Sequence, residues 1–107
     1  MARTLINIPA TAKRGEVIEI RATIGHPMET GFRPGDDGKT LPRNIIQVFS
    51  CKYNGEPVFS AELFSAISAN PYIAFYTTAI ESGSFVLSWE GDNGFTQTET
   101  VAITVTA

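Results

Sequence analysis

The sequence has few of the residues on which most catalytic and nucleic-acid-binding sites depend. Its 107 residues include one histidine, one cysteine and three lysines, and only 18% are charged, against roughly 25% in soluble domains. A formal net charge of -3 excludes an electrostatically driven nucleic-acid binder, which needs a basic face to displace counterions. One cysteine excludes an intrachain disulfide framework. One histidine leaves little room for a zinc site built on histidines.

Long apolar runs are also missing. No stretch approaches the roughly 20 apolar residues of a membrane span, so we expect no membrane partner. No run of signal-peptide length precedes Pro9 and Lys13, which taken alone predicts a cytoplasmic chain or a mature form without its signal. The lone Cys51 does not decide the compartment, because a single thiol stays reduced in the cytoplasm or pairs with another chain outside it.

The residues that are present predict one domain over residues 1–107. A mass of 11.6 kDa with 43% hydrophobic residues is enough for one core. Between closely spaced turn signals the apolar residues alternate with period two, as in half-buried strands. The pattern predicts strands at residues 3–8, 16–25, 44–53, 58–63, 72–80 and 85–90, and a final threonine-rich strand that includes 100–106.

The turn signals divide these strands. Asn54-Gly55 predicts a tight type I′ hairpin, because both residues tolerate positive φ. Residues 26–42 are rich in proline, glycine and aspartate and predict one long loop, and 64–70 predict a short irregular or helical link. About seven strands without a long helix favour an all-β, immunoglobulin-like antiparallel sandwich with Trp89 in its core. A small eight-stranded barrel is the competing architecture.

No group of residues indicates an enzyme or a cofactor site. The stretch 36–39 lacks the alternating carboxylates of a calcium loop. His26, Met28 and Cys51 are residue types that bind copper. We favour instead a histidine that hydrogen-bonds the loop backbone and a buried structural cysteine. No Gly-x-Ser-x-Gly elbow and no phosphate-binding glycine loop occur. A small metal-dependent redox protein that uses these three residues remains an alternative.

Several phrases spread over nearly the whole chain resemble one family. They are Ala12-Lys13-Arg14-Gly15-Glu16, His26-Pro27-Met28-Glu29-Thr30-Gly31, Gly38-Lys39-Thr40-Leu41-Pro42-Arg43, Phe49-Ser50-Cys51 ahead of Asn54-Gly55, Ser68-Ala69-Asn70-Pro71-Tyr72 with Phe75, and Trp89 ahead of an acidic turn. With these phrases the chain resembles the SoxZ family, the smaller subunits of the SoxYZ sulfur carriers of bacterial thiosulfate oxidation. The phrase at residues 26–31 is the most specific of them.

The resemblance implies a fold and a role. Members of the family are immunoglobulin-like sandwiches and are not enzymes. They pair, as a heterodimer or heterotetramer, with a SoxY-type subunit whose C-terminal Gly-Gly-Cys-Gly arm carries the sulfur intermediate, and other sulfur-oxidation enzymes contact the pair transiently. This chain ends in Val105-Thr106-Ala107 without such an arm. The resemblance therefore implies that it is the SoxZ subunit of the pair and not the SoxY subunit. The family pattern is export to the periplasm on the partner's twin-arginine signal.

A partner patch should be apolar and poor in lysine and glutamate. On this ground the loop residues His26, Met28, Phe32 and Arg33 form one candidate patch, unless the loop is only shaped by its prolines and glycines. Alternation sets Ile46 and Val48 opposite Phe49, Cys51 and Tyr53, so we expect one of these sets to face solvent or a partner, unless both are core. Further candidates are Asn70, Pro71 and Tyr72, with Cys51 as a possible interchain thiol. A free-standing immunoglobulin-like binding module is the remaining alternative.

Overall fold

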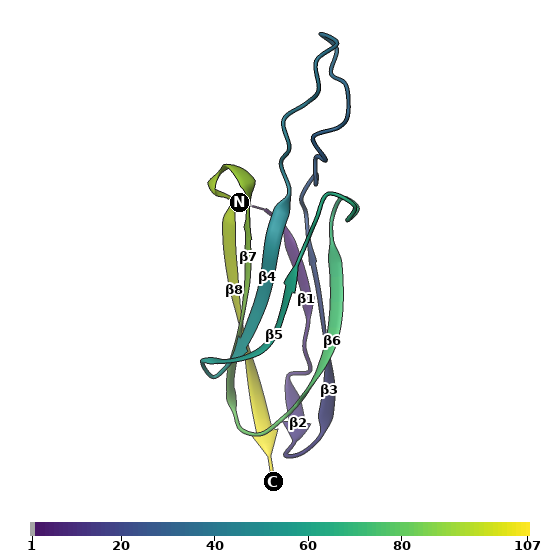
Figure 1. The fold of residues 1–107 in the computed structure, drawn as a ribbon. Helices are drawn as coiled ribbons and strands as arrows, with labels where there is room; N and C mark the ends of the chain where they lie inside the picture. Colours follow the sequence, from purple (N-terminus) through teal and green to yellow (C-terminus); the bar gives the residue numbers. More distant parts are fainter. Residues whose placement is uncertain (1) are drawn as a thin grey trace.

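The computed structural model describes residues 2–107, which form two β-sheets packed face to face (Figure 1). One sheet has three strands in the order β1-β3-β6 and the other has five in the order β2-β8-β7-β4-β5. The sheets stay separate, so the sandwich prediction is confirmed and the barrel is not formed. The elements are β1 (Thr4–Asn7), β2 (Thr11–Lys13), β3 (Val17–Ile24), β4 (Ile46–Tyr53), β5 (Glu56–Glu62), β6 (Tyr72–Thr78), β7 (Gly83–Gly91), the short 3-10 turn η1 (Asp92–Gly94) and β8 (Thr96–Thr106).

The core lies between the sheets, where alternation places the apolar residues. In β3, Ile18, Ile20, Ala22 and Ile24 are all buried. Trp89 of β7 is 1% exposed and packs against Phe49 of β4, with ring centroids 5.2 Å apart. Burying one large apolar side chain contributes about 1.5–3 kcal/mol. Trp89 is thus the core residue that the sequence predicts.

The hairpin at Asn54-Gly55 forms as predicted. Both residues have positive φ, 49° and 85°, which is the backbone of a type I′ turn. The Asn54 side chain joins this hairpin to the start of β7, because its Oδ1 accepts a hydrogen bond from the Ser84 N–H at 3.0 Å. A Cβ on Gly83 would lie 1.8 Å from that oxygen, so a side chain at this position would displace the Asn54 amide.

Strand β2 is an eighth strand beyond the seven predicted. It has three residues and pairs in parallel with β8, with Ala12 opposite Val105. The segment before it, β1, pairs with β3 in the other sheet. The chain therefore crosses from one sheet to the other at Ile8-Pro9-Ala10, and this crossing ties the two sheets together at one side.

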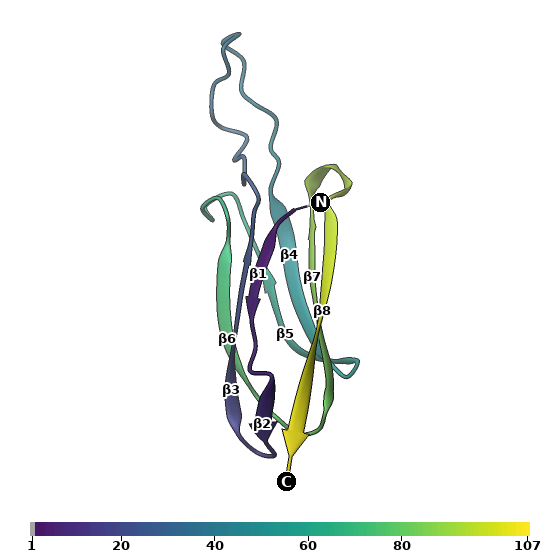
Figure 2. The same ribbon diagram turned by 180° about the vertical axis from the view of Figure 1, so that it is seen from behind.

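The predicted long loop extends as an arm, defined here as residues 26–45, beyond the end of the sandwich opposite the C-terminus (Figures 1 and 2). Its two halves are joined by isolated bridges, Glu29 with Asn44 and Pro34 with Thr40. The molecule measures 61 × 20 × 19 Å and has a radius of gyration of 16.3 Å, against about 13 Å for a compact chain of this length. The arm accounts for the elongated shape.

Within residues 2–107, no helix has the length and the apolar character that crossing a membrane requires.

Candidate partner interface

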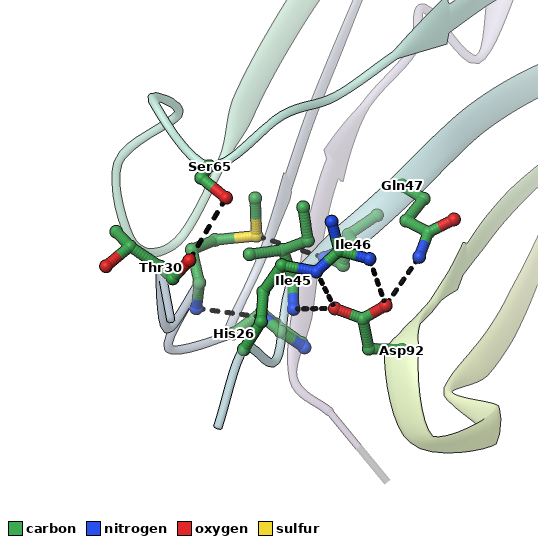
Figure 3. A network of polar contacts seen from close by, with 9 residues as sticks. His26, Thr30, Ile45, Ile46, Gln47, Ser65 and Asp92 are labelled. Carbon is green, nitrogen blue, oxygen red and sulfur yellow. Dashed lines mark hydrogen bonds and ion pairs between the residues drawn. The ribbon is translucent and has the colours of Figure 1, made fainter. Parts of the chain in front are cut away.

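The arm base, defined here as residues 26–28 and 43–45, is fixed to the sandwich by Asp92 of η1 (Figure 3). The Asp92 carboxylate accepts hydrogen bonds from Nε and Nη2 of Arg43, both at 2.9 Å, from the Ile45 N–H at 3.0 Å, and from the Gln47 side-chain amide. The Arg43 bonds, helped by the Ile45 N–H, lower the pKa of Asp92, because they favour the charged form. The carboxylate therefore holds the chain where the arm returns into β4.

His26 and Met28 lie inside the arm base and not on its surface. His26 is 5% exposed, its Nδ1 accepts a hydrogen bond from the Met28 N–H at 3.0 Å, and its ring meets Phe95 edge-on at 5.0 Å. Met28 is 4% exposed, and its sulfur accepts a hydrogen bond from the Ile46 N–H at 3.2 Å. His26 thus hydrogen-bonds the loop backbone, as the sequence analysis favoured. Neither buried side chain is available to a partner, which corrects their assignment to an interface.

The copper alternative requires His26, Met28 and Cys51 to converge, and they do not. The Met28 sulfur lies at Ile46, whereas Cys51 is five residues further along β4, roughly 16 Å away at the rise of an extended strand. Across residues 2–107, no three His, Cys, Asp or Glu side chains are grouped as metal ligands. The sulfur and Nδ1 atoms are instead used by backbone N–H groups.

Cys51 is a core residue. It is 0% exposed, between Phe49 and Tyr53 on the inner face of β4. Burial raises the pKa of its thiol to about 11, so the group is a neutral thiol near pH 7. A partner's thiol cannot reach it while β4 is folded. The prediction that Cys51 links to another chain is therefore corrected to a structural role.

The exposed residues of the arm remain candidates for contact with a partner. Phe32 is 80% exposed. Arg33 pairs with Glu29 of the same half of the arm at 2.7 Å, and its side chain stays largely in solvent. The arm therefore presents two exposed side chains that follow one another in the sequence, an aromatic ring and a guanidinium group whose charge is balanced by Glu29.

Ile46 lies on the opposite face from the one that alternation predicts. A β-bulge between Ile46 and Val48 adds Gln47 as an extra residue, so that Ile46 lies opposite Gly91 and Val48 opposite Glu90. The bulge reverses the alternation and turns Ile46 into the core, where it is 0% exposed. Val48 is half-buried and lines a hollow of about 250 Å³ with Arg43 and Phe64 at the arm base. Only Val48 of this pair faces outward.

The candidates Asn70, Pro71 and Tyr72 lie just before and at the start of β6. The Asn70 N–H donates to the His26 carbonyl at 2.8 Å, and Asn70 Oδ1 accepts from the His26 N–H at 3.1 Å. Pro71 is buried, which corrects its assignment to an interface, and its carbonyl accepts a hydrogen bond from the Ile24 N–H. Tyr72 is 59% exposed. Asn70, which is also exposed, therefore fixes the arm base and remains a candidate for contact with a partner, as does Tyr72.

The structure adds an apolar surface that the sequence analysis did not identify. We define the outer tyrosine face as Leu5, Val17, Tyr72, Ala74 and Tyr76, on the solvent side of the three-stranded sheet. Leu5 is 70% exposed, Val17 63% and Tyr76 67%. The sequence does not reveal this face, because residues 72–76 are apolar or aromatic at every position. Without alternating polar residues, the inner and outer faces of β6 cannot be told apart.

Polar residues on the same face are paired with one another. Arg21 Nε donates to Glu19 Oε1 at 2.8 Å, and this bond raises the pKa of Arg21. A hollow of about 430 Å³ lies beside this pair, and one of about 300 Å³ lies beside Leu5 and Asn70. The face thus combines exposed apolar side chains with an ion pair whose charges cancel, and it is bordered by two hollows. A surface with apolar content and little net charge suits a protein partner.

Solved structures with this fold include a superoxide reductase (neelaredoxin) from Ignicoccus hospitalis. It has a TM-score of 0.76 and 15% identity, over 98% of this chain and 82% of that one. The sulfur carrier protein SoxY from Chlorobium limicola f thiosulfatophilum has a TM-score of 0.66 and 12% identity, over 97% and 79% of the two chains. These similarities show a shared fold.

Comparison by sequence is more specific. No curated protein sequence matches the chain. The family model for the sulphur oxidation protein SoxZ matches residues 6–102, nearly the whole chain. That span includes the arm, its base and strand β6. The chain therefore belongs to the SoxZ family.

Proposed function

We propose that this protein is the non-catalytic subunit of a SoxYZ-type sulfur carrier. It pairs with a SoxY-type subunit whose C-terminal cysteine arm holds the thiosulfate-derived intermediate, and it helps to dock the other sulfur-oxidation enzymes. The match of the SoxZ family model over residues 6–102 carries this proposal. The burial of Cys51 supports it, because a neutral, inaccessible thiol is a poor sulfur acceptor.

Co-purification tests the pairing. The chain, tagged, is expressed together with a neighbouring-gene partner that ends in Gly-Gly-Cys-Gly, and we expect a stable complex of the two. A monodisperse, tagged monomer with no bound partner would contradict the proposal and favour the free-standing binding module.

Intact mass spectrometry tests the division of labour. After thiosulfate exposure in the complete enzyme system, we expect the added mass on the partner's terminal cysteine and none on this chain. A Cys51→Ala variant is the matched control, and it should support the same modification of the partner. An adduct on Cys51 would assign the carrier role to this chain instead.

Family membership also supports a periplasmic location, with the chain exported together with its folded partner. Fractionation should recover the chain from the periplasm when the partner has an intact twin-arginine signal. With that signal changed to two lysines, the chain should stay in the cytoplasm. Export that is unaffected by the partner's signal would contradict this route.

A further inference from the structure

Strand β6 is an open sheet edge that lacks the usual protection against pairing. It is the outer strand of the order β1-β3-β6 and runs over seven residues, Tyr72–Thr78. Its sequence, YIAFYTT, has no charged residue, no proline and no glycine. Its pairing with β3 is regular over the whole length. Native proteins usually interrupt exposed edges with charges, prolines or bulges.

The other three edges are shorter or carry such interruptions. Strand β1 has four residues and β2 has three. Strand β5 has Pro57 with a glutamate at each end, and a register shift lies opposite it at Cys51 and Lys52. Strand β6 is therefore the edge best suited to accept another strand.

The register shows which backbone groups of β6 face outward. The Ile24 N–H donates to the Pro71 carbonyl at 3.3 Å, and the Ala79 N–H donates to the Glu16 carbonyl at 2.8 Å. In an antiparallel ladder the hydrogen-bonded pairs recur at every second residue. Residues 73, 75 and 77 therefore bond to β3, and the N–H and C=O groups of 72, 74, 76 and 78 point away from it. No turn or loop backbone within residues 2–107 bonds to these outward groups.

The same four residues direct their side chains to the outer tyrosine face. Tyr72 and Tyr76 leave roughly 250 Å² of side-chain surface exposed, at about 200 Å² for each aromatic side chain. Leu5 and Val17 of this face are 63–70% exposed, and Ile80, which follows β6, is 57% exposed. Together with the tyrosines they expose apolar surface on the order of 500 Å². The Glu19–Arg21 pair lies on the same face, so this area is a sum over the face and not one contiguous patch. It is most of the ~800 Å² that each partner buries in a standard interface.

We infer that β6 pairs antiparallel with an edge strand of the SoxY-type carrier subunit, so that one β-sheet runs across the two chains. The inference rests on the proposed function. The known SoxY structure shares this fold over 97% of the present chain, so a partner of that fold has an edge strand at the equivalent place. Two equivalent edges related by a local two-fold axis meet antiparallel. Partner side chains would then cover Tyr72 and Tyr76.

Hydrogen exchange on the wild-type pair tests the edge directly. In the complex, we expect the amides of Tyr72, Ala74, Tyr76 and Thr78 to exchange roughly 10-fold or more slowly than in the free chain, as is usual for amides that gain a hydrogen bond. The amides of residues 73, 75 and 77 already bond to β3 and should change less. This alternation is the signature of strand addition, and contact through side chains alone would not produce it.

Ala74→Pro tests the same edge by removing one outward N–H. This N–H makes no bond to β3, and proline is accepted on edge strands whose N–H faces solvent, so the free variant should keep the fold. We expect the Kd for the carrier subunit to rise roughly 10- to 100-fold. The variant lacks one hydrogen-bond donor, and the proline ring hinders the approach of a second strand. Ala74→Val is the matched control, because it keeps the N–H, and its Kd should stay within about 3-fold of wild type.

The possible outcomes separate the two proposals. A complex that forms while the four outward amides exchange at their free rates overturns edge pairing and leaves the carrier-subunit function standing. If the wild-type chain binds no carrier subunit, the proposed function fails, and the occupant named here fails with it. A dimer of this chain alone in sedimentation, abolished by Ala74→Pro, would assign the edge to a second copy and overturn the choice of partner.

Discussion

At the scale of single residues, His26 shows how the arm base depends on protonation. Its Nδ1 accepts the Met28 N–H bond, so the neutral imidazole is the form that fits. Burial lowers the pKa of His26, and the nearby Asp92 carboxylate opposes this in part. A protonated Nδ1 cannot accept a hydrogen bond. The folded state therefore binds the proton less readily than the unfolded chain does.

The first prediction concerns pH. The folded pKa of His26 lies below the unfolded value of about 6.5. The contribution of the neutral imidazole to the free energy of unfolding is therefore complete above about pH 6.5. It is lost as the pH falls through 6.5 toward the folded pKa. We expect a lower free energy of unfolding at pH 5 than at pH 7 in urea titrations. In His26→Asn, whose Oδ1 still accepts the Met28 N–H, the curve should be flatter. An unchanged slope would contradict this role.

The carboxylates do not obscure this window. Hydrogen bonds lower the pKa values of Asp92, Glu29 and Glu99, so their contributions are present above the ordinary carboxylate values and are lost below them. The stability that these carboxylates contribute is therefore lost only at pH values below about 4.5. The change between pH 7 and pH 5 reports mainly on the histidine.

The second prediction concerns Cys51. Cys51→Ala removes one buried atom, which should lower the free energy of unfolding by about 1 kcal/mol without changing partner binding. In the wild-type chain, a thiol reagent should react at the rate of unfolding, because burial keeps the thiol neutral and shielded. Rapid stoichiometric labelling under native conditions would contradict the buried position.

The burial of His26 and Met28 could not be predicted from the sequence. Both follow a strand in a stretch rich in turn residues, and such stretches are usually exposed. Their burial depends on Phe95 and Ile46, residues distant in the sequence. By contrast, the burial of Trp89 and Cys51 followed from local alternation, since each lies within a regular part of its strand.

At the scale of elements, turns set the positions of strands through single side chains. Asn54 in the β4–β5 hairpin hydrogen-bonds the Ser84 N–H at the start of β7, and the lack of a side chain at Gly83 makes room for it. One asparagine therefore fixes both the tight turn and the register of its neighbour.

A double-mutant cycle makes the third prediction. A Cβ at position 83 would overlap Asn54 Oδ1, so Gly83→Ala should cost about 2–3 kcal/mol of unfolding free energy, the range of overpacking. Asn54→Gly keeps the positive φ and should cost less than that. In the double variant the clash is absent, so the two costs should be less than additive. Additive values from urea titration would contradict the contact.

The arm base gives the fourth prediction. Asp92→Asn removes the charge that Arg43 and the Ile45 N–H share. We expect the Ile45 amide to exchange roughly 10-fold faster, as in a locally opened segment, with the amides of β3 unchanged. Arg43→Lys is the matched comparison, because it keeps the charge and loses the two-pronged geometry. Faster exchange over the whole chain would indicate global destabilisation instead.

The strands were largely predictable, and the exceptions have physical causes. Strands β3, β7 and β8 have clear alternation between turn residues. Strand β2 is only three residues long and pairs with β8 at a distance of over 90 residues in sequence, so no local pattern marks it. The bulge at Gln47 depends on pairing with β7, and it reverses the side of Ile46 without changing the local hydrophobic pattern.

At the scale of the whole molecule, the arm and the outer tyrosine face are separate surfaces. The arm extends past the end of the sandwich, whereas the three-stranded sheet that carries the outer tyrosine face runs along its side. Under the proposed function, the sheet would hold the carrier subunit and the tip of the arm would be left exposed to a visiting enzyme. The elongated shape was not predictable, because a loop rich in glycine and proline gives no measure of how far it projects.

The fifth prediction concerns the tip of the arm. Phe32→Ser should change the free energy of unfolding by less than about 0.5 kcal/mol, as is usual at an exposed site. It should leave carrier pairing intact. If the arm docks the sulfur-oxidation enzymes, turnover of the complete system should fall roughly 10-fold, as when an interface aromatic is lost. Phe32→Tyr should retain turnover. Full turnover with Phe32→Ser would remove the arm from the docking surface.

The two hydrogen bonds between Asn70 and His26 have a thermodynamic consequence. Asn70 is two residues before the start of β6, and His26 lies at the root of the arm. A strand added to β6 restrains Asn70 and hence the root of the arm. An enzyme that binds only the ordered arm would then bind the paired chain more tightly than the free chain. Because linkage is reciprocal, a visiting enzyme with that preference would tighten the carrier pair by the same factor.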